Sequence, residues 1–139
     1  MQIGMAEFLD NVSKVKAHKT RVEALKMNDS VVLRTILQAA YDPHVEWLIP
    51  EGRPPYTPSK LQDQQHMLIR EIRLVKNFIK GFGDNINKNK REMMFIELLE
   101  RLDPKDAELL CDLKDKKFPH STTVTKGVVK EAFPDLIPE

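Results

Sequence analysis

A lysine-rich stretch near the C-terminal end has residue types and a spacing that could bind phosphate. Its candidate residues are Lys114, Lys116, Lys117, Thr125, Lys126 and Lys130. Thr125 is a suitable N-cap for a following helix, whose first-turn N–H groups and positive dipole end would point back toward the lysines. A solvated loop before an ordinary surface helix is the alternative interpretation, because capped helix starts and lysines are both common.

A second basic cluster lies at the helix start expected after Gly83. It consists of Lys88, Lys90 and Arg91. The cluster is a second candidate for phosphate contacts, and a solvated helix face explains it equally well.

Catalytic and metal-binding patterns do not occur in the sequence. There is no phosphate loop of the form G-x-x-x-x-G-K-[ST], no H-E-x-x-H and no C-x-x-C, and the four histidines are scattered. Asp103 and Asp106 form an acidic pair, but acids in a first helical turn are explained by the helix dipole. We therefore predict a protein that is not an enzyme and has no cofactor and no metal. The single Cys111 excludes an internal disulfide and is interpreted as a small buried apolar residue.

Length and composition suit one domain over residues 1–139, with 41% hydrophobic and 31% charged residues. The net charge of +1 means that any nucleic-acid contact must come from local patches of cations. No apolar run approaches a membrane span, and the start of the chain lacks a signal pattern. We expect a protein that works in the cytoplasm without membrane contact.

Helical periodicity and cap residues recur along the chain, and no stretch alternates with period two, so the expected fold is all-α. We predict a compact multi-helix domain of about seven to eight helices. The first predicted helix covers residues 5–15, and a long one runs from Ser59 to Gly81. The starts of the other predicted helices are the Thr20-x-x-Glu23 capping box, Asp29 or Ser30, Asp42-Pro43, Asn87, Asp103-Pro104 and Thr125.

The order of motifs at both ends of the chain carries a resemblance. Asp112-Leu113 is followed, after a loop, by V-T-x-x-V-V-x-x-A-F-P-x-L-I-P-E over residues 124–139, and the N-terminal helices lead into residues 33–43. This order resembles the N-terminal DNA-binding domain of ATP-dependent DNA ligases, most closely the T-even-phage type. The resemblance covers nearly the whole chain except residues 52–83. The chain is also similar to a family of short, uncharacterised proteins encoded by T4-like phages of marine bacteria.

The resemblance implies contacts with the backbone of duplex DNA, without strong sequence preference. It places Thr125 and Lys126 at the start of the gripping helix and Lys130 one turn further on, while Lys114, Lys116 and Lys117 come from a loop that is longer than in the ligases. That loop contains Pro119 and no glycine. The K-x-D-G adenylation motif of the ligases is absent, so the resemblance extends to DNA binding and not to ligase chemistry.

We therefore expect a non-enzymatic phage DNA-binding or replication and repair accessory protein in the cytoplasm of an infected bacterium. The alternatives are a protein-interaction adaptor that docks on a phage or host replication, repair or transcription protein, and a structural virion component. Convergence of the two lysine patches on one face would favour DNA. An exposed apolar patch around Trp47, Tyr56 or Phe118 would favour a protein partner.

Overall fold

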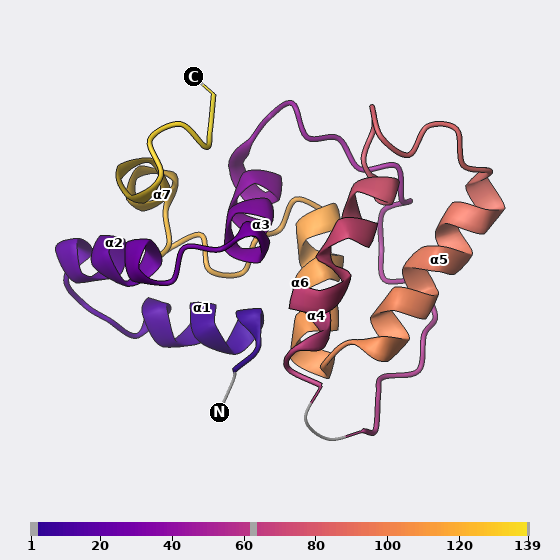
Figure 1. The fold of residues 1–139 in the computed structure, drawn as a ribbon, viewed down its shortest axis with the longest axis horizontal. Helices are drawn as coiled ribbons and strands as arrows, with labels where there is room; N and C mark the ends of the chain where they lie inside the picture. Colours follow the sequence, from indigo (N-terminus) through magenta and orange to yellow (C-terminus); the bar gives the residue numbers. More distant parts are fainter. Residues whose placement is uncertain (1–2, 62–63, 139) are drawn as a thin grey trace.

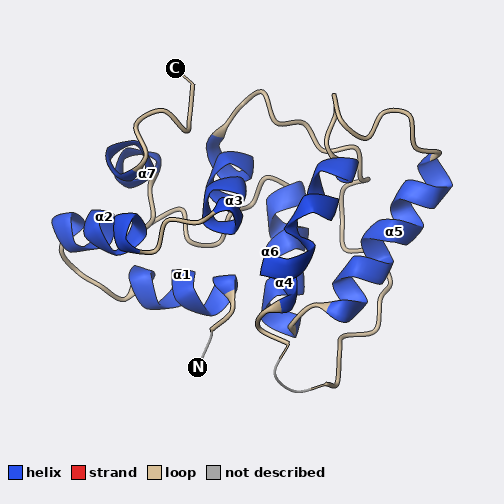
Figure 2. Cartoon of the chain, in the orientation of Figure 1, coloured by secondary structure: helices blue, strands red, loops and turns tan. Residues whose placement is uncertain are grey.

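The computed structural model describes residues 3–61 and 64–138, and the all-α prediction is confirmed over these ranges (Figure 2). The helices are α1 (Met5–Ser13), α2 (His18–Met27), α3 (Val31–Tyr41), α4 (Met67–Glu71), the 3-10 helix η1 (Ile72–Phe78), α5 (Lys88–Arg101), α6 (Pro104–Lys114) and α7 (Lys126–Ala132). The described ranges contain no strand, and their only sheet-like pairing is an isolated antiparallel bridge between Trp47 and Ile79.

Helix α6 lies at the centre of the packing and contacts α1, α3 and α5. Its inward face carries Ala107, Leu110 and Cys111, each at most 1% exposed. Burial of such apolar side chains supplies the main stabilisation of the fold. Helices α2 and α7 lie together at one end of the long axis of the molecule, and α5 lies at the other end (Figure 1).

Four of the predicted helix starts are confirmed by their caps. The side chains of Ser30, Asn87, Asp103 and Thr125 each accept a hydrogen bond from an N–H group in the first turn of the helix that follows. These bonds satisfy donors that have no partner within the helix, and they depend only on residues two or three positions apart.

The prediction that a capping box at Thr20 starts the second helix is wrong. Helix α2 begins earlier, at His18, and its N-cap residue Ala17 provides no side-chain hydrogen bond. Thr20 therefore lies within the first turn. The turn before the helix is held instead by Arg21, whose Nε donates to the Val15 carbonyl at 2.6 Å.

The helix expected at Asp42-Pro43 does not form. Asp42 ends α3, and its carboxylate accepts a hydrogen bond from the His44 amide at 2.8 Å, which makes a turn. The chain then extends, because Leu48 donates its amide to the Phe78 carbonyl and Lys80 donates to Glu46. Tertiary backbone pairing thus replaces the local helix in this segment.

The prediction of one long helix from Ser59 to Gly81 is wrong about its length. Residues 62–63 lie outside the described residues, and helical structure starts at Met67 and tightens into the 3-10 helix η1 from Ile72. Ile79 leaves the helix in an extended conformation because it pairs with Trp47. The helix therefore ends at Phe78, before the predicted end at Gly81, and Gly81 belongs to the turn that follows, where it adopts a φ of +98°, which glycine tolerates best.

Candidate nucleic-acid interface

The start of α7 has the local geometry that the sequence predicts. The Thr125 hydroxyl accepts a hydrogen bond from the Val128 amide at 3.2 Å, and the Thr125 carbonyl accepts from the Val129 amide at 3.0 Å. The two preceding amides belong to Lys126 and Gly127, and neither has an internal acceptor within the described part of the chain. Both residues are exposed. Two N–H groups and one ammonium group therefore face solvent together at this helix start.

Packing against α2 holds this helix start in place. Val128 and Val129 are buried, and the helix pair makes the most extensive contact between elements in the fold. Arg21 of α2 donates to the Thr123 carbonyl at 3.5 Å, and His18 lies 3.0 Å from Glu131. The position of α7 is therefore set by contacts about a hundred residues apart in the sequence.

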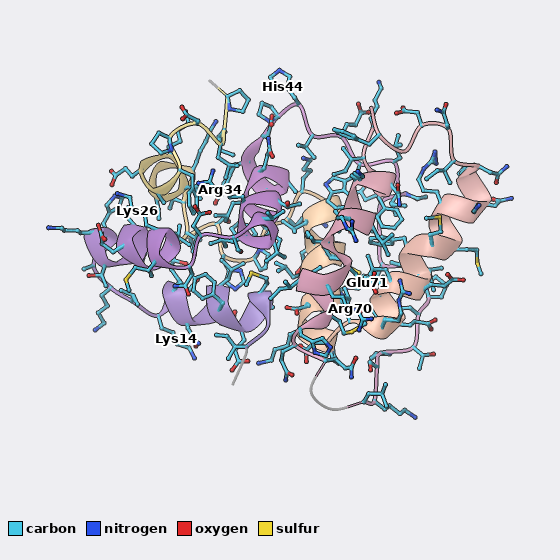
Figure 3. The ribbon with its side chains drawn as sticks, viewed as in Figure 1. Lys14, Lys26, Arg34, His44, Arg70 and Glu71 are labelled. Atoms are coloured by element: carbon cyan, nitrogen blue, oxygen red, sulfur yellow. The ribbon has the colours of Figure 1, made fainter. Side chains whose placement is uncertain are left out.

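The same contacts bring additional lysines into the neighbourhood. The Thr123 hydroxyl donates to Ser13 Oγ at 2.7 Å, so the end of α1 lies against the loop before α7. The chain that follows Ser13 carries exposed Lys14, Lys16 and Lys19, and Lys14 projects away from α1 in Figure 3. Their sequence pattern indicates cations at a helix C-terminus. Only the tertiary contacts relate them to α7.

Lys114 is placed differently from the expectation for a phosphate-binding residue. Its side chain is fully buried, and its Nζ donates to the carbonyls of Pro50 and Gly52 and to Asp115 Oδ1 at 2.9, 2.6 and 2.7 Å. Burial opposes ionisation of Asp115, but hydrogen bonds from Lys114 and the Gly52 amide outweigh it, so the pKa of this carboxyl lies below its usual value. All three donors of the ammonium group are used. Lys114 is therefore a structural cation, unavailable to DNA in this fold.

Lys116 is an exposed residue, but its ammonium group is bonded to the main chain of a distant segment. Its Nζ donates to the carbonyls of Ala39 and Val45 at 3.3 and 2.7 Å, at the end of α3. Burial lowers the pKa of this ammonium group. Its backbone has a φ of +58°, the one positive value at a non-glycine residue in the described ranges. Lys117 is also exposed, and in the described part of the chain its ammonium group has no hydrogen bond or ion pair, although Asp112 and Asp115 lie near enough to interact with it electrostatically.

The second basic cluster also contains both exposed cations and one cation that bonds inside the fold. Lys88 and Lys90 are exposed in the first turn of α5, after the Asn87 cap. Arg91 is buried and donates to the Ile86 carbonyl at 3.1 Å, so it is not a surface cation. The start of α5 lies at the opposite end of the molecule from α7 (Figure 1). The two patches therefore do not converge on one face, so the arrangement expected to favour DNA is not found, and any DNA contact must come from one patch alone.

The aromatic residues singled out in the sequence do not form an exposed apolar patch. Phe118 is buried, with its ring 5.7 Å from that of Tyr41 in an edge-to-face arrangement. Trp47 and Tyr56 are partly buried and pack against the core. The large hydrophobic side chains that are exposed in the described ranges are instead Met27, Val31, Leu61, Phe82 and Met93.

His18, His44 and His120 each lie beside a different acid, and these pairs are scattered over the fold. His120 is buried, and its Nε2 lies 2.6 Å from Asp10 Oδ1, which joins the α6–α7 connection to α1. His44 projects from the edge of the molecule (Figure 3). Within residues 3–61 and 64–138, no three His, Cys, Asp or Glu side chains are grouped as metal ligands would be.

A family model matches residues 8–120, which is most of the chain. The protein belongs to DUF6433, a family of unknown function. No curated protein matches the sequence. The DUF6433 match includes Lys88, Lys90 and Lys117 and ends before Thr125. Among the helices of the described ranges, none combines the length and apolarity needed to cross a bilayer.

Proposed function

We propose that this protein binds the phosphate backbone of duplex DNA without strong sequence preference, as a non-enzymatic accessory protein in phage replication or repair. One observation carries the proposal. At the start of α7, the Thr125 cap leaves the amides of Lys126 and Gly127 exposed and without internal acceptors beside an exposed lysine. Exposed N–H groups at the positive end of a helix, next to a cation, are suited to a phosphate oxygen.

The proposed contact set is smaller than the sequence expectation. It keeps Lys117, Lys126 and the half-buried Lys130, whose ammonium groups have no hydrogen-bond acceptor among the described residues, and Thr125, whose hydroxyl caps α7. It omits Lys114, Lys116 and Arg91, whose donors bond to protein carbonyls. The exposed lysines after α1 extend the set, since the loop before α7 lies against the end of α1.

Such a surface predicts weak, salt-sensitive binding. The net charge of +1 provides no global attraction to DNA, so affinity depends on a few local phosphate contacts. Each contact releases condensed counterions, which makes the affinity fall as salt rises. Phosphate contacts carry little base information, so unrelated sequences should bind alike.

The test is a salt titration of binding to nicked and intact duplexes. Replacing Lys117, Lys126 and Lys130 together by Ala should lower affinity by a similar factor on unrelated sequences. If all three lysines contact phosphates, the slope of log affinity against log salt should fall by roughly three units. Thermal melts establish beforehand that the variant is folded.

The matched control is the double variant Lys88→Ala and Lys90→Ala, which removes exposed lysines from the opposite end of the molecule. It should leave the slope unchanged. If folded wild-type protein has no measurable DNA affinity at low salt, or if the control and the triple variant behave alike, DNA binding by α7 is excluded.

A protein-interaction adaptor is the second candidate, and exposed Val31 and Phe82 favour it, because each is 71% exposed. Large apolar side chains held in solvent are typical of interaction sites when they belong to one continuous surface. No feature of the described residues favours the third candidate, a virion component.

A further inference from the structure

A groove runs between α3 and η1 on a surface that the DNA proposal does not use. It consists of two adjoining hollows of about 400 and 210 Å³ that share Thr35, Lys76 and Ile79. Phe82 lines one hollow and Val31 lines the other. The two most exposed apolar side chains of this region therefore belong to one continuous feature, which we call the α3–η1 groove.

The floor of the groove is aliphatic and its walls are fixed. Ile72 and Ile79 come from the η1 side, and Ala39 and Val45 from the α3 side. The backbone bonds between the segments around Trp47 and Ile79, at 2.7 and 2.8 Å, join the two walls. Lys116 adds a further link through the Val45 carbonyl. A groove held by such bonds presents its apolar floor without needing a rearrangement.

The rim of the groove is cationic. Arg73, Lys76 and Lys80 are all exposed along the η1 side. Lys80 forms an ion pair with Glu46 at 3.6 Å between two exposed side chains, which is a weak interaction. Glu71 lines a neighbouring hollow together with Arg73 and Lys76. Among the described residues, neither Arg73 nor Lys76 has an ion-pair partner.

The acid nearest to the floor does not neutralise this rim. Asp42 is buried, and its carboxylate accepts hydrogen bonds from Gln38 Nε2 at 3.2 Å and from the His44 amide. These bonds outweigh the effect of burial and hold the pKa of Asp42 below its usual value. Asp42 therefore keeps a negative charge in the lining of one hollow, but its oxygens are engaged in these bonds, and the exposed cations of the rim outnumber it.

We infer that the α3–η1 groove docks an acidic amphipathic helix of a partner protein. Apolar side chains of that helix would cover Val31, Ile79 and Phe82, and its carboxylates would face Arg73, Lys76 and Lys80. The residues of α3 and its C-cap that line the groove span positions 31 to 42, about 16 Å at the rise of an α-helix, which matches about three turns of a docked helix. Helices that dock in grooves use anchors at such spacing.

A peptide helix fits this surface better than a single strand of nucleic acid. Strand-binding grooves stack successive bases on several aromatic side chains, whereas the described residues that line the two hollows include one phenyl ring, Phe82, and one imidazole, His44, both in the same hollow. The remaining apolar floor is formed by branched aliphatic residues and alanine, which suit leucine-like anchors. The inference refines the adaptor candidate and is independent of DNA binding by α7.

The experiment starts from a displayed library of random 16-residue peptides selected on the immobilised full chain. Enriched peptides should be net acidic and carry large apolar residues at i, i+3 or i+4, and i+7 spacing. A labelled synthetic copy of the most enriched peptide is then titrated with each protein variant by fluorescence anisotropy.

Two groove variants should weaken binding of that peptide by about tenfold or more, as expected for anchor residues and rim charges. They are Phe82→Ala and the double change Lys76→Glu with Lys80→Glu. The matched controls are Met93→Ala, which removes another exposed apolar side chain, and Lys88→Glu with Lys90→Glu. Both controls should bind as wild type does. Because Phe82 is 71% exposed, its replacement should leave the melting temperature nearly unchanged.

Other results would overturn the inference. Enriched peptides without acidic and apolar character, or peptides that bind the Phe82→Ala variant equally well, would show that the groove is not their site. Binding of a 20-residue oligothymidylate that is lost in Phe82→Ala, with no peptide enriched, would make the groove a strand-binding site. A dimer in sedimentation that dissociates in Phe82→Ala would make it a contact between copies of this chain. Duplex binding should persist in Phe82→Ala, so failure of the DNA proposal remains distinguishable.

Discussion

The two halves of the connection between α6 and α7 use the same residue type for opposite purposes. In the first half, the ammonium groups of Lys114 and Lys116 bond to main-chain carbonyls of distant segments. In the second half, the ammonium groups of Lys117 and Lys126 have no such bond among the described residues. Lysines that look alike in the sequence therefore have two roles: some bond to the main chain as structural cations, and others remain surface cations.

The difference comes from the supply of acceptors. A buried ammonium group must have its donors satisfied, because an unpaired charge in the interior is very costly. The carbonyls of Pro50 and Gly52 and the Asp115 carboxylate provide those acceptors for Lys114. Lys117 is exposed, and its ammonium group bonds to no such acceptor in the described part of the chain. The following variants test this contrast in order of decreasing expected effect.

Replacing Lys114 by Met should lower the free energy of unfolding by about 3–5 kcal/mol, because it leaves a partly buried carboxylate and two carbonyls without their cation. Lys117→Met is the matched control and should change stability by less than about 0.5 kcal/mol. Urea denaturation of both variants at one pH gives the comparison. Equal stability of the two variants would contradict the division into structural and surface cations.

Asp106 is a buried charge whose partner is an amide and not a cation, since its Oδ1 accepts from the Ala6 amide at 2.8 Å. Burial raises the pKa of Asp106 to about 6 from 3.8, with smaller contributions from Asp103 and Glu7. The folded state therefore holds its proton to a higher pH than the unfolded state does. Ionisation of the buried carboxylate should therefore lower the free energy of unfolding as pH rises from about 4 to 6. The loss should reach about 3 kcal/mol above that range.

Asp106→Asn should remove that pH dependence while keeping an oxygen for the Ala6 amide. The stability difference between variant and wild type should shift in favour of the variant by about 3 kcal/mol between pH 4 and pH 7. Urea denaturation at several pH values measures it, and all other titrating groups are common to both proteins. Parallel stability curves would mean that Asp106 is not desolvated in the folded state.

Lys116 occupies a left-handed position at the end of α6, where glycine is usually favoured. Lys116→Met keeps the backbone cost and loses both carbonyl contacts, so it should destabilise the fold by about 1–3 kcal/mol. Lys116→Gly loses the same contacts but relieves the backbone, and should be about 1 kcal/mol more stable than the Met variant. Urea denaturation of the Met and Gly variants measures the difference in their free energies of unfolding. Equal stability of the two variants would contradict a backbone cost at this position.

The sequence by itself determined the helical class and four helix starts. The caps at Ser30, Asn87, Asp103 and Thr125 could be predicted because each depends on a side chain and an amide two or three residues apart. Burial of Cys111 also followed from its apolar neighbours. These features are local, so the chain near them contains the information that they need.

Tertiary structure decided the rest, because the relevant partners are distant in the chain. The helix expected at Asp42-Pro43 is replaced by pairing with residues around Ile79. The burial of the Lys114 ammonium group depends on carbonyls that lie 62 and 64 positions away in the sequence. The distance between the two lysine patches depends on how α5 and α7 pack at opposite ends of the molecule. A lysine carries the same charge in either setting, and only the fold determines whether water or a buried carbonyl becomes its partner.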